Sequence, residues 1–374
     1  MTLPPIITDA AVFSGNECFL HHGQFTEVIF GTGAAARLAG HIDAIGTRSV
    51  ILATPGQSKT AERIGVALGG RVVGVFADAV THSPVAVSDR VADAVRRVKA
   101  DLLVSFGGGS AIGLGKAVSL RTGLKHIAVP TTYSGSELTP ILGETAAGMK
   151  RTQRDNKLRP ALVLYDPALS YGVRRDASLA SGMNALAHAV EAMYMSEDET
   201  ILRVASAAIE HLRIALPLIH AASTDPAARC RALYGAWLAA FCLADTPMAL
   251  HHKLCHTLGG AYDLPHGQTH AVLLPHSLAY NAPAVPRGYD ALRRLLSDLN
   301  PDPAQALFAL VDGLGLPPSL SALGLPQSGI NRVRRLACEN AYANPRPIEP
   351  AALGRLLTRA WMGAAPDLEV HRHA

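Results

Sequence analysis

The chain has 374 residues, of which 49% are hydrophobic and 5% aromatic, and its formal net charge is +4. This length suggests two domains with sizeable cores, while dispersed basic residues and few aromatics argue against a nucleic-acid partner and favour a small anionic ligand. Because no apolar run approaches the roughly 18 residues that span a bilayer and no secretory leader is recognisable, we expect no membrane association.

Cysteine usage indicates the compartment. The five cysteines are odd in number and show no CxxC spacing. Such cysteines are typical of small buried hydrophobic side chains, not of a disulfide framework or a zinc ribbon. We therefore expect a reducing compartment, the cytoplasm.

The first part of the chain alternates short apolar runs with helical patterns. Continuous apolar strands separated by helices indicate a parallel sheet that is covered on both faces. This alternation predicts an α/β domain over residues 1–173, with a Rossmann-like, dinucleotide-binding sheet. The predicted strands cover residues 27–30, 49–53, 71–76, 101–106 and 126–130.

From about residue 174 the strand-like runs disappear. Long patterns rich in alanine, leucine and arginine follow, separated by proline-containing turns. They predict an all-helical domain over residues 174–374. The predicted helices cover residues 179–195, 200–221, 226–243, 248–259, 288–299 and 304–314.

A glycine-rich loop follows the fourth predicted strand and reads Gly107-Gly108-Gly109-Ser110. Glycines allow backbone N–H groups to approach an anion, and the following helix contributes partial positive charge, so this loop suits a pyrophosphate. A tight strand-to-helix turn is the alternative, because glycine is the usual turn residue. The spacing differs from GxGxxG, so the usual dinucleotide fingerprint is absent.

The next strand also ends in hydroxyl groups, in the sequence Thr131-Thr132-Tyr133-Ser134-Gly135-Ser136-Glu137. Donor-rich loops at adjacent strand ends fit the crevice in which open α/β sheets bind ligands. We therefore expect a dinucleotide that contacts Thr131, Thr132 and Ser136.

The end of the second strand is where an acidic residue would meet the adenine ribose. This chain has Thr54-Pro55-Gly56-Gln57 there, with no acid. We therefore expect Thr54 and Pro55 to contact the cofactor, and both NADH and NADPH to be accepted, because nothing repels a 2′-phosphate.

Histidines recur at helical spacing in the second half. Asn184 and His188, like His252 and His256, are four residues apart and so share a helix face, and a later loop supplies His266. Such a group suits carbonyl polarisation or a divalent metal. A lone histidine is more often a structural residue. We assign that role to His82, His126, His211, His220 and His276.

Four motifs resemble signatures of the iron-containing (group III) alcohol dehydrogenase family in order and spacing. They are 107–110, 130–137, 182–191 and 252–266, and the resemblance extends from about Phe30 to Pro366. It implies that family's two-domain architecture, which dehydroquinate synthase shares. It also implies an active site in the cleft between the domains and a homodimer.

Within this family the chain resembles the maleylacetate reductases. The metal-dependent alcohol dehydrogenases have an aspartate where Gly113 stands, and they ligate metal through an aspartate where this chain has Asn184. The resemblance places Asn184, His188, His252 and His266 at the four ligand positions, and all four are neutral. Because an anionic ligand adds at least several kcal/mol to the binding of a divalent ion, we expect weak or no metal affinity.

The resemblance implies reduction of maleylacetate to 3-oxoadipate by NADH or NADPH, in the degradation of aromatic compounds. Hydride addition to the conjugated alkene leaves negative charge on the carbonyl oxygen, which hydrogen-bond donors must stabilise. The expected donors are His252 and His256, and His188 and His266 shape the same wall. One of these histidines, or Tyr133 through its hydroxyl, supplies the proton.

The substrate is a dicarboxylate, so cationic partners are expected. The candidates are His251, Lys253 and Arg346, although solvated surface charge explains the last two equally well. Lys150, on the loop after the second hydroxyl motif, resembles the family lysine that contacts the cofactor.

Three other functions remain open. A metal-dependent alcohol dehydrogenase uses the same fold, and a lyase of the dehydroquinate synthase type shares the architecture but needs bound zinc. A non-catalytic binding or zinc-storage protein is the third. The neutral residue at position 184 argues against the first two, and paired phosphate and imidazole sites argue against the last.

Overall fold

The computed structural model describes residues 3–7, 13, 19–146, 149–339 and 342–368. The chain divides into two compact units. The first comprises residues 1–173 and 224–234, and the second comprises 174–223 and 235–374. Residues 224–234, which the sequence analysis assigned to the helical domain, therefore belong with the α/β unit.

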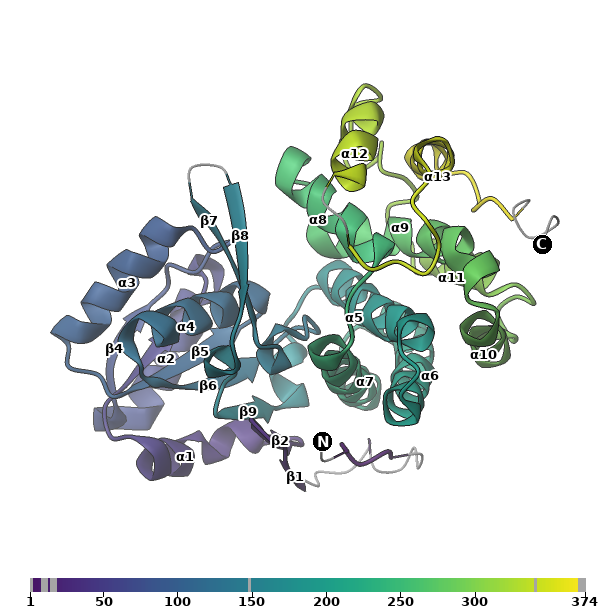
Figure 1. Ribbon diagram of the computed structural model, residues 1–374. Helices are drawn as coiled ribbons and strands as arrows, with labels where there is room; N and C mark the ends of the chain where they lie inside the picture. Colours follow the sequence, from purple (N-terminus) through teal and green to yellow (C-terminus); the bar gives the residue numbers. More distant parts are fainter. Residues whose placement is uncertain (1–2, 8–12, 14–18, 147–148, 340–341, 369–374) are drawn as a thin grey trace. The chain divides into compact units, whose positions relative to one another are not determined.

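The first unit is built on a seven-stranded sheet (Figure 1). Its strand order is β1-β2-β9-β6-β5-β3-β4, and all neighbours are parallel except the antiparallel pair β1 and β2. The strands are β1 (Phe19–His22), β2 (Glu27–Phe30), β3 (Ser49–Leu52), β4 (Val72–Phe76), β5 (Leu102–Gly107), β6 (Lys125–Pro130) and β9 (Leu162–Tyr165).

Both faces of this sheet are buried, which explains why its strands are continuous apolar runs. Successive side chains of β3 point to opposite faces, because the strand period is two. Val50 and Leu52 join a core with α3 (Val85–Arg97) and α4 (Gly109–Thr122). Ile51 joins a second core with α1 (Leu38–Ile45) and α2 (Ser58–Leu68) on the other face.

The strand order places three loops side by side. From β3 the chain moves outward to β4 and then returns across β3 to β5, so the direction of winding reverses between β3 and β5. The next strand, β6, pairs with β5. Because parallel strands end at the same edge, the loops after β3, β5 and β6 form the crevice where such sheets bind ligands.

Three features of this unit were not predicted from the sequence. Strand β1 pairs with β2, strand β9 pairs with β2 and β6, and a separate hairpin is formed by β7 (Ile141–Ala146) and β8 (Met149–Arg154). The expectation that Lys150 lies on a loop is wrong, because Lys150 is in β8 and pairs with Thr145. The hairpin has polar outer positions and lacks the apolar run by which the other strands were recognised.

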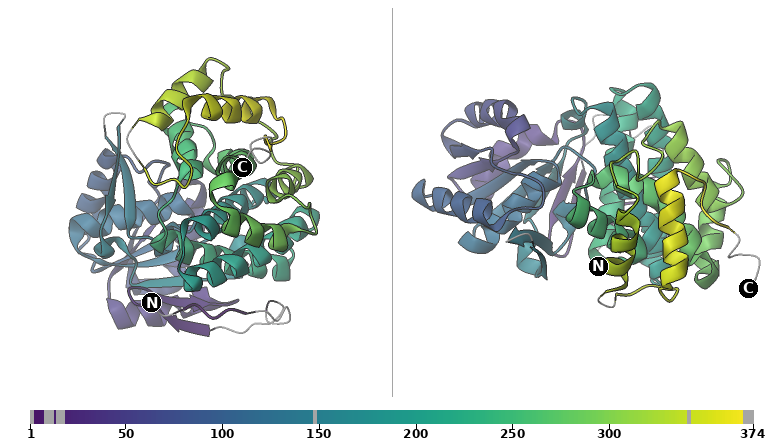
Figure 2. Two further views of the ribbon diagram at one scale, coloured as in Figure 1. Left: turned by 45° about the vertical axis from the view of Figure 1, so that its right-hand side comes forward. Right: turned by 90° about the horizontal axis from the view of Figure 1, so that it is seen from above.

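The second unit is helical in all three views (Figures 1 and 2). Among the described residues, no single helix is both long and apolar enough to cross a membrane, and α7 and α8 reach that composition only as a pair bent by 96°. The helices are α5 (Arg175–Met195), α6 (Glu199–Ala221), the second half of α7 (Pro226–Asp245), α8 (Leu250–Tyr262), α9 (His266–Asn281), α10 (Pro286–Leu296), α11 (Pro303–Gly313), α12 (Gly329–Cys338) and α13 (Pro350–Met362).

Helix α9 was not predicted, and placing His266 on a loop was wrong, because His266 is its first residue. The segment has glycine near its start and Pro275 in its interior, and both lower intrinsic helix propensity. Every residue from Thr269 to Asn281 is buried, so tertiary packing stabilises a helix that local propensity disfavours.

A close approach of two backbones positions α9 against α5. A Cβ atom added to Gly267 would lie 2.8 Å from the carbonyl oxygen of Ala180 and 2.9 Å from its carbonyl carbon. Only glycine tolerates this distance, because a backbone neighbour cannot rotate away. Gly267 therefore brings the start of α9, with His266, close to the helix that carries Asn184 and His188.

We predict that Gly267→Ala destabilises the protein by about 2 kcal/mol, because the added methyl group overpacks the contact between α9 and α5. The free energy of unfolding in urea measures this. Gly260→Ala, in α8, is the matched control: nothing lies within 4 Å of its added Cβ atom, so stability should rise by about 0.5 kcal/mol. Equal stability of the two variants would contradict the prediction.

Candidate active site

The glycine-rich loop of the first unit lies between β5 and α4. Helix α4 begins at Gly109, and its N-cap residue is Gly108. Gly108 has no side chain that could accept hydrogen bonds from the first-turn N–H groups. These groups and the helix dipole are therefore available to an anion, and Ser110 lies half-buried in the same turn.

Gln57 connects the three loops at this edge of the sheet. Its amide nitrogen donates to Thr131 Oγ1 at 3.1 Å, and its amide oxygen accepts from Thr54 Oγ1 at 3.2 Å. A Cβ atom on Gly107, whose φ is 142°, would lie 2.3 Å from that same oxygen. Sequence analysis quoted Gln57 but gave it no role, because only the sheet topology places it between the other two loops.

The hydroxyl loop, Thr131–Glu137, packs directly against the glycine loop. A Cβ atom on Gly108 would lie 2.8 Å from Thr132 Oγ1. Thr131 is buried, whereas Thr132 and Ser136 are half-buried. Together with Thr54 and Pro55, which begin the turn after β3, they stay the predicted cofactor residues.

The expectation that Tyr133 supplies a proton is not supported. Its side chain is only 1% exposed, within the first unit. Burial raises the pKa of its hydroxyl, and the neighbouring buried Arg229 only partly opposes this. A buried phenol with a raised pKa is a poor proton donor.

Six histidines gather in the second unit, in contact through their rings. His188 and His252 stack with ring centroids 5.0 Å apart, and His266 and His270 lie 4.4 Å apart. Of the four predicted residues, His188 contacts His252, His252 contacts His256, and His256 contacts His266. His188 and His266 are connected through His270. The whole cluster is His188, His251, His252, His256, His266 and His270.

Glu191 organises this cluster, and the sequence analysis gave it no role. Its side chain is fully buried. Oε1 accepts from the backbone N–H groups of Ala249 at 3.2 Å and His251 at 3.1 Å, and Oε2 bonds to His252 Nδ1. The spacing could have revealed it, because His188 and Glu191 follow Asn184 by four and seven residues and so lie on the same helix face.

The bond to Glu191 determines which nitrogen of His252 faces the cluster. Since a carboxylate only accepts, Nδ1 carries a proton and Nε2 is directed elsewhere. Nε2 is buried and has no hydrogen-bond partner among the described residues, and the same holds for Asn184 Oδ1. With His188 Nδ1 and His270 Nε2, four polar atoms are buried here without a hydrogen-bond partner among the described residues, which is typical of a site that receives a ligand.

His251 is a supporting residue, so the expectation that it contacts a substrate carboxylate is not supported. It is fully buried, its Nδ1 bonds to Ser277 Oγ at 3.0 Å, and its Nε2 bonds to His270 Nδ1 at 2.8 Å. Burial and the neighbouring imidazoles lower the pKa of His188, His251 and His270 well below the usual value. His270 was also missed, although it follows His266 by four residues.

His256 and His266 are the exposed members of the cluster. Their rings are nearly parallel, at 11°, with centroids 6.0 Å apart. His256 is also 6.1 Å from the ring of His252. Exposure makes these two imidazoles the ones that a small molecule reaches first.

Lys253 and Arg346 are held by other parts of the helical unit. Lys253 Nζ donates to the carbonyl oxygen of Glu339 at 3.2 Å, and it lies over the ring of Tyr342. The Arg346 guanidinium donates to the carbonyl oxygen of Tyr280 at 3.1 Å and lies 4.5 Å from the centre of its ring. Each side chain keeps further N–H donors beside these contacts, so a role in binding the substrate's carboxylates stays a prediction for both residues.

A metal site needs ligand atoms that lie close to one another. Within the part of the chain that the structure describes, one group of three histidine, cysteine or acidic side chains has ligand atoms within 4.8 Å of one another, namely His251, Cys255 and His270. Its two imidazoles already hydrogen bond to each other. His188, His252 and His266 do not form such a group.

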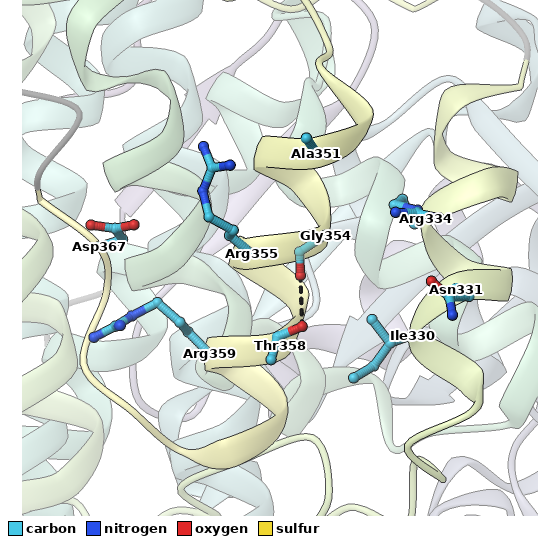
Figure 3. Close-up of a pocket in the computed structure, with 9 residues that line it drawn as sticks. All are labelled: Ile330, Asn331, Arg334, Ala351, Gly354, Arg355, Thr358, Arg359 and Asp367. Carbon is cyan, nitrogen blue, oxygen red and sulfur yellow. Dashed lines mark hydrogen bonds between the residues drawn. The ribbon is translucent and has the colours of Figure 1, made fainter.

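A separate cavity of about 410 Å³ lies between α12 and α13 (Figure 3). Arg334 from α12 and Arg355 and Arg359 from α13 line it, together with Asp367. None of the predicted site residues lines it, so we assign the chemistry to the histidine cluster.

Models of one family match both units. The model of the iron-containing alcohol dehydrogenases matches residues 26–167, and that of the C-terminal part of the family matches residues 178–361. The chain therefore belongs to the iron-containing alcohol dehydrogenase family and is an oxidoreductase with a nicotinamide nucleotide cofactor.

Several relatives share one activity. The chain is 47% identical to the maleylacetate reductase of Sphingobium indicum, covering 91% of this chain and 96% of that one. It is 44% identical to the maleylacetate reductase of Burkholderia cepacia, covering 93% and 99%. The crystal structure of maleylacetate reductase from Agrobacterium tumefaciens matches with a TM-score of 0.87 at 43% identity, covering 93% and 99%.

We predict that Gly107→Ala weakens NADH binding at least about tenfold, because a side chain there would be strained at its φ and would displace the amide of Gln57. Titration of NADH fluorescence measures the Kd. In the control, Gly56→Ala, the added Cβ atom has nothing within 4 Å, and its Kd should stay within about twofold of the wild type. An unchanged Kd for Gly107→Ala would remove the loop from the cofactor site.

Proposed function

We propose that the chain is a maleylacetate reductase, which uses NADH or NADPH to reduce the enone double bond of maleylacetate and yields 3-oxoadipate. The observation that carries this proposal is the similarity to maleylacetate reductases over nine-tenths of the chain. The histidine cluster supports it, because this reaction needs donors around a developing oxyanion. A cytoplasmic homodimer stays a prediction.

The chemistry requires two transfers. Hydride from the reduced nicotinamide adds to the alkene carbon distal to the ketone, and the electron pair moves onto the carbonyl oxygen as an enolate. The α-carbon then takes a proton, which gives the saturated ketone. We infer that the exposed imidazoles of His256 and His266 donate to the oxygen or the carbon; their exposure and the short distance between their rings support this role.

His252 contributes differently. Its Nδ1 donates to Glu191, so the ring is fixed, and Nε2 presents a lone pair that accepts a hydrogen bond from bound substrate. Asn184, one helical turn before His188, offers its amide to the same region, where its oxygen lacks a protein partner. We infer that uncharged side chains, not a charged ligand set, line the substrate site, and that donation to the enolate oxygen comes from His256 or His266.

We further propose that a tightly held divalent metal is not required. The positions that would hold one, Asn184, His188, His252 and His266, provide no negative charge. Among the described residues, the ligand atoms of these three imidazoles do not all lie within 4.8 Å of one another, and an anionic ligand contributes several kcal/mol to such sites.

The alternative is a metal-dependent alcohol dehydrogenase. The observation in its favour is that Asn184 Oδ1 and His252 Nε2 are buried atoms without partners. Both can present lone pairs, as a cation requires.

The decisive experiment follows NADH and NADPH oxidation with freshly prepared maleylacetate, with and without a chelator, and with a panel of simple alcohols as the alternative substrates. We expect turnover of maleylacetate with either cofactor, retained after chelation, because donors in the protein stabilise the enolate. Turnover of alcohols that depends on stoichiometric iron or zinc would instead establish the alternative.

We also predict that His256→Ala lowers kcat by at least about tenfold and changes KM for maleylacetate much less, because the donor acts mainly in the transition state. Steady-state kinetics measures both constants. His22→Ala, at an exposed position of the first unit, is the matched control and should leave both unchanged. An unaltered kcat would remove His256 from the chemistry.

A further inference from the structure

A fully buried lysine lies beneath the nucleotide loops of the first unit. Lys116, in α4, has an exposed fraction of 0%. Burial of an ammonium is costly unless hydrogen bonds replace its water. The replacement is complete: Nζ donates to the carbonyl oxygens of Ser136, Thr139 (2.8 Å) and Ile141 (3.0 Å), and to Thr139 Oγ1 (2.9 Å).

All these oxygens belong to one short segment, residues 136–141. This segment begins with the last two residues of the hydroxyl loop, Ser136 and Glu137, and ends at the first residue of β7. Lys116 therefore ties the segment to α4, whose first turn contains the end of the glycine loop. The ordering of three carbonyl groups by one ammonium restricts the backbone more than any single hydrogen bond.

Contacts within the hydroxyl loop connect the segment held by Lys116 to the glycine loop. Ser134 Oγ donates to Glu137 Oε2 at 3.3 Å, and Glu137 Oε1 accepts from Tyr165 at 2.8 Å. A Cβ atom on Gly109 would lie 3.4 Å from the Cβ atom of Ser134. A shift of the segment held by Lys116 would therefore move the side chains that border the glycine loop.

We propose that Lys116 is a positioning residue for the cofactor: its ammonium holds residues 136–141 against α4 and so keeps the hydroxyl loop and the glycine loop in the geometry that receives the pyrophosphate. This inference rests on the proposed role of these loops in nucleotide binding. It assigns a function to a lysine that has no contact with solvent.

The arrangement also predicts a dependence of cofactor affinity on pH. Burial lowers the pKa of Lys116 to about 7, Glu137 opposes this shift, and Arg159 adds to it. His126 is the other titratable neighbour, and burial lowers its pKa to about 3, so it stays neutral. Below its pKa Lys116 has three N–H donors, and above it only two remain for four oxygens. Affinity should therefore fall as pH rises through this pKa.

The test is direct titration of NADH by fluorescence, between about pH 6 and about pH 9, without maleylacetate. Lys116→Met should raise the Kd about tenfold near pH 6 and remove most of its pH dependence, because the anchor is lost in every state. Lys116→Arg, which stays charged, should restore binding in part and give a flat profile. Lys125→Met, at an exposed position that begins β6, is the control and should behave as the wild type.

A purely structural role for Lys116 would lower the melting temperature of Lys116→Met but leave its Kd and pH profile unchanged, and that result would overturn the proposal. If Lys116→Met does not fold, Thr139→Val tests the same contact, because it removes one acceptor and keeps the lysine. It should raise the Kd about threefold, and an unchanged Kd would again overturn the proposal. Because maleylacetate is absent, failure of the substrate assignment leaves this result unaffected.

Discussion

The histidine cluster depends on one buried carboxylate. Glu191 accepts hydrogen bonds from the backbone where α8 begins and orients the imidazole of His252. The positive end of the helix dipole at the start of α8 stabilises this charge. Without Glu191, two N–H groups and a ring nitrogen would be buried unpaired, at a cost of about 3 to 5 kcal/mol. Glu191 therefore both holds α5 against the start of α8 and fixes the orientation of the His252 ring.

The two units build their sites in different ways. In the first unit the backbone forms the site, because a Cβ atom on Gly107 or Gly108 would displace Gln57 or Thr132. In the second unit the side chains of α5, α8 and α9 supply the chemistry, and Gly267 allows the close approach. A loop of N–H groups suits a phosphate, and a wall of imidazoles suits a polarised carbonyl.

Much of this was predictable, and the misses have physical reasons. Strands β3, β5 and β6 were recognised because burial on both faces makes them continuous apolar runs. Helix α9 was missed because Pro275 and Gly267 lower its local propensity, which only tertiary burial overcomes. His251 was expected to meet substrate because a sequence shows hydrogen-bonding capacity but not which partners occupy it.

The sequence by itself determined the two-part organisation, the glycine and hydroxyl loops, the neutral residue at position 184 and the family resemblance, because periodicity and motif spacing are local properties. Only the tertiary structure decided that Glu191 orients His252, that His270 joins the cluster and that Lys116 anchors residues 136–141. These contacts join segments about 20 to 60 residues apart in the chain, and which buried groups meet there depends on how helices and strands pack.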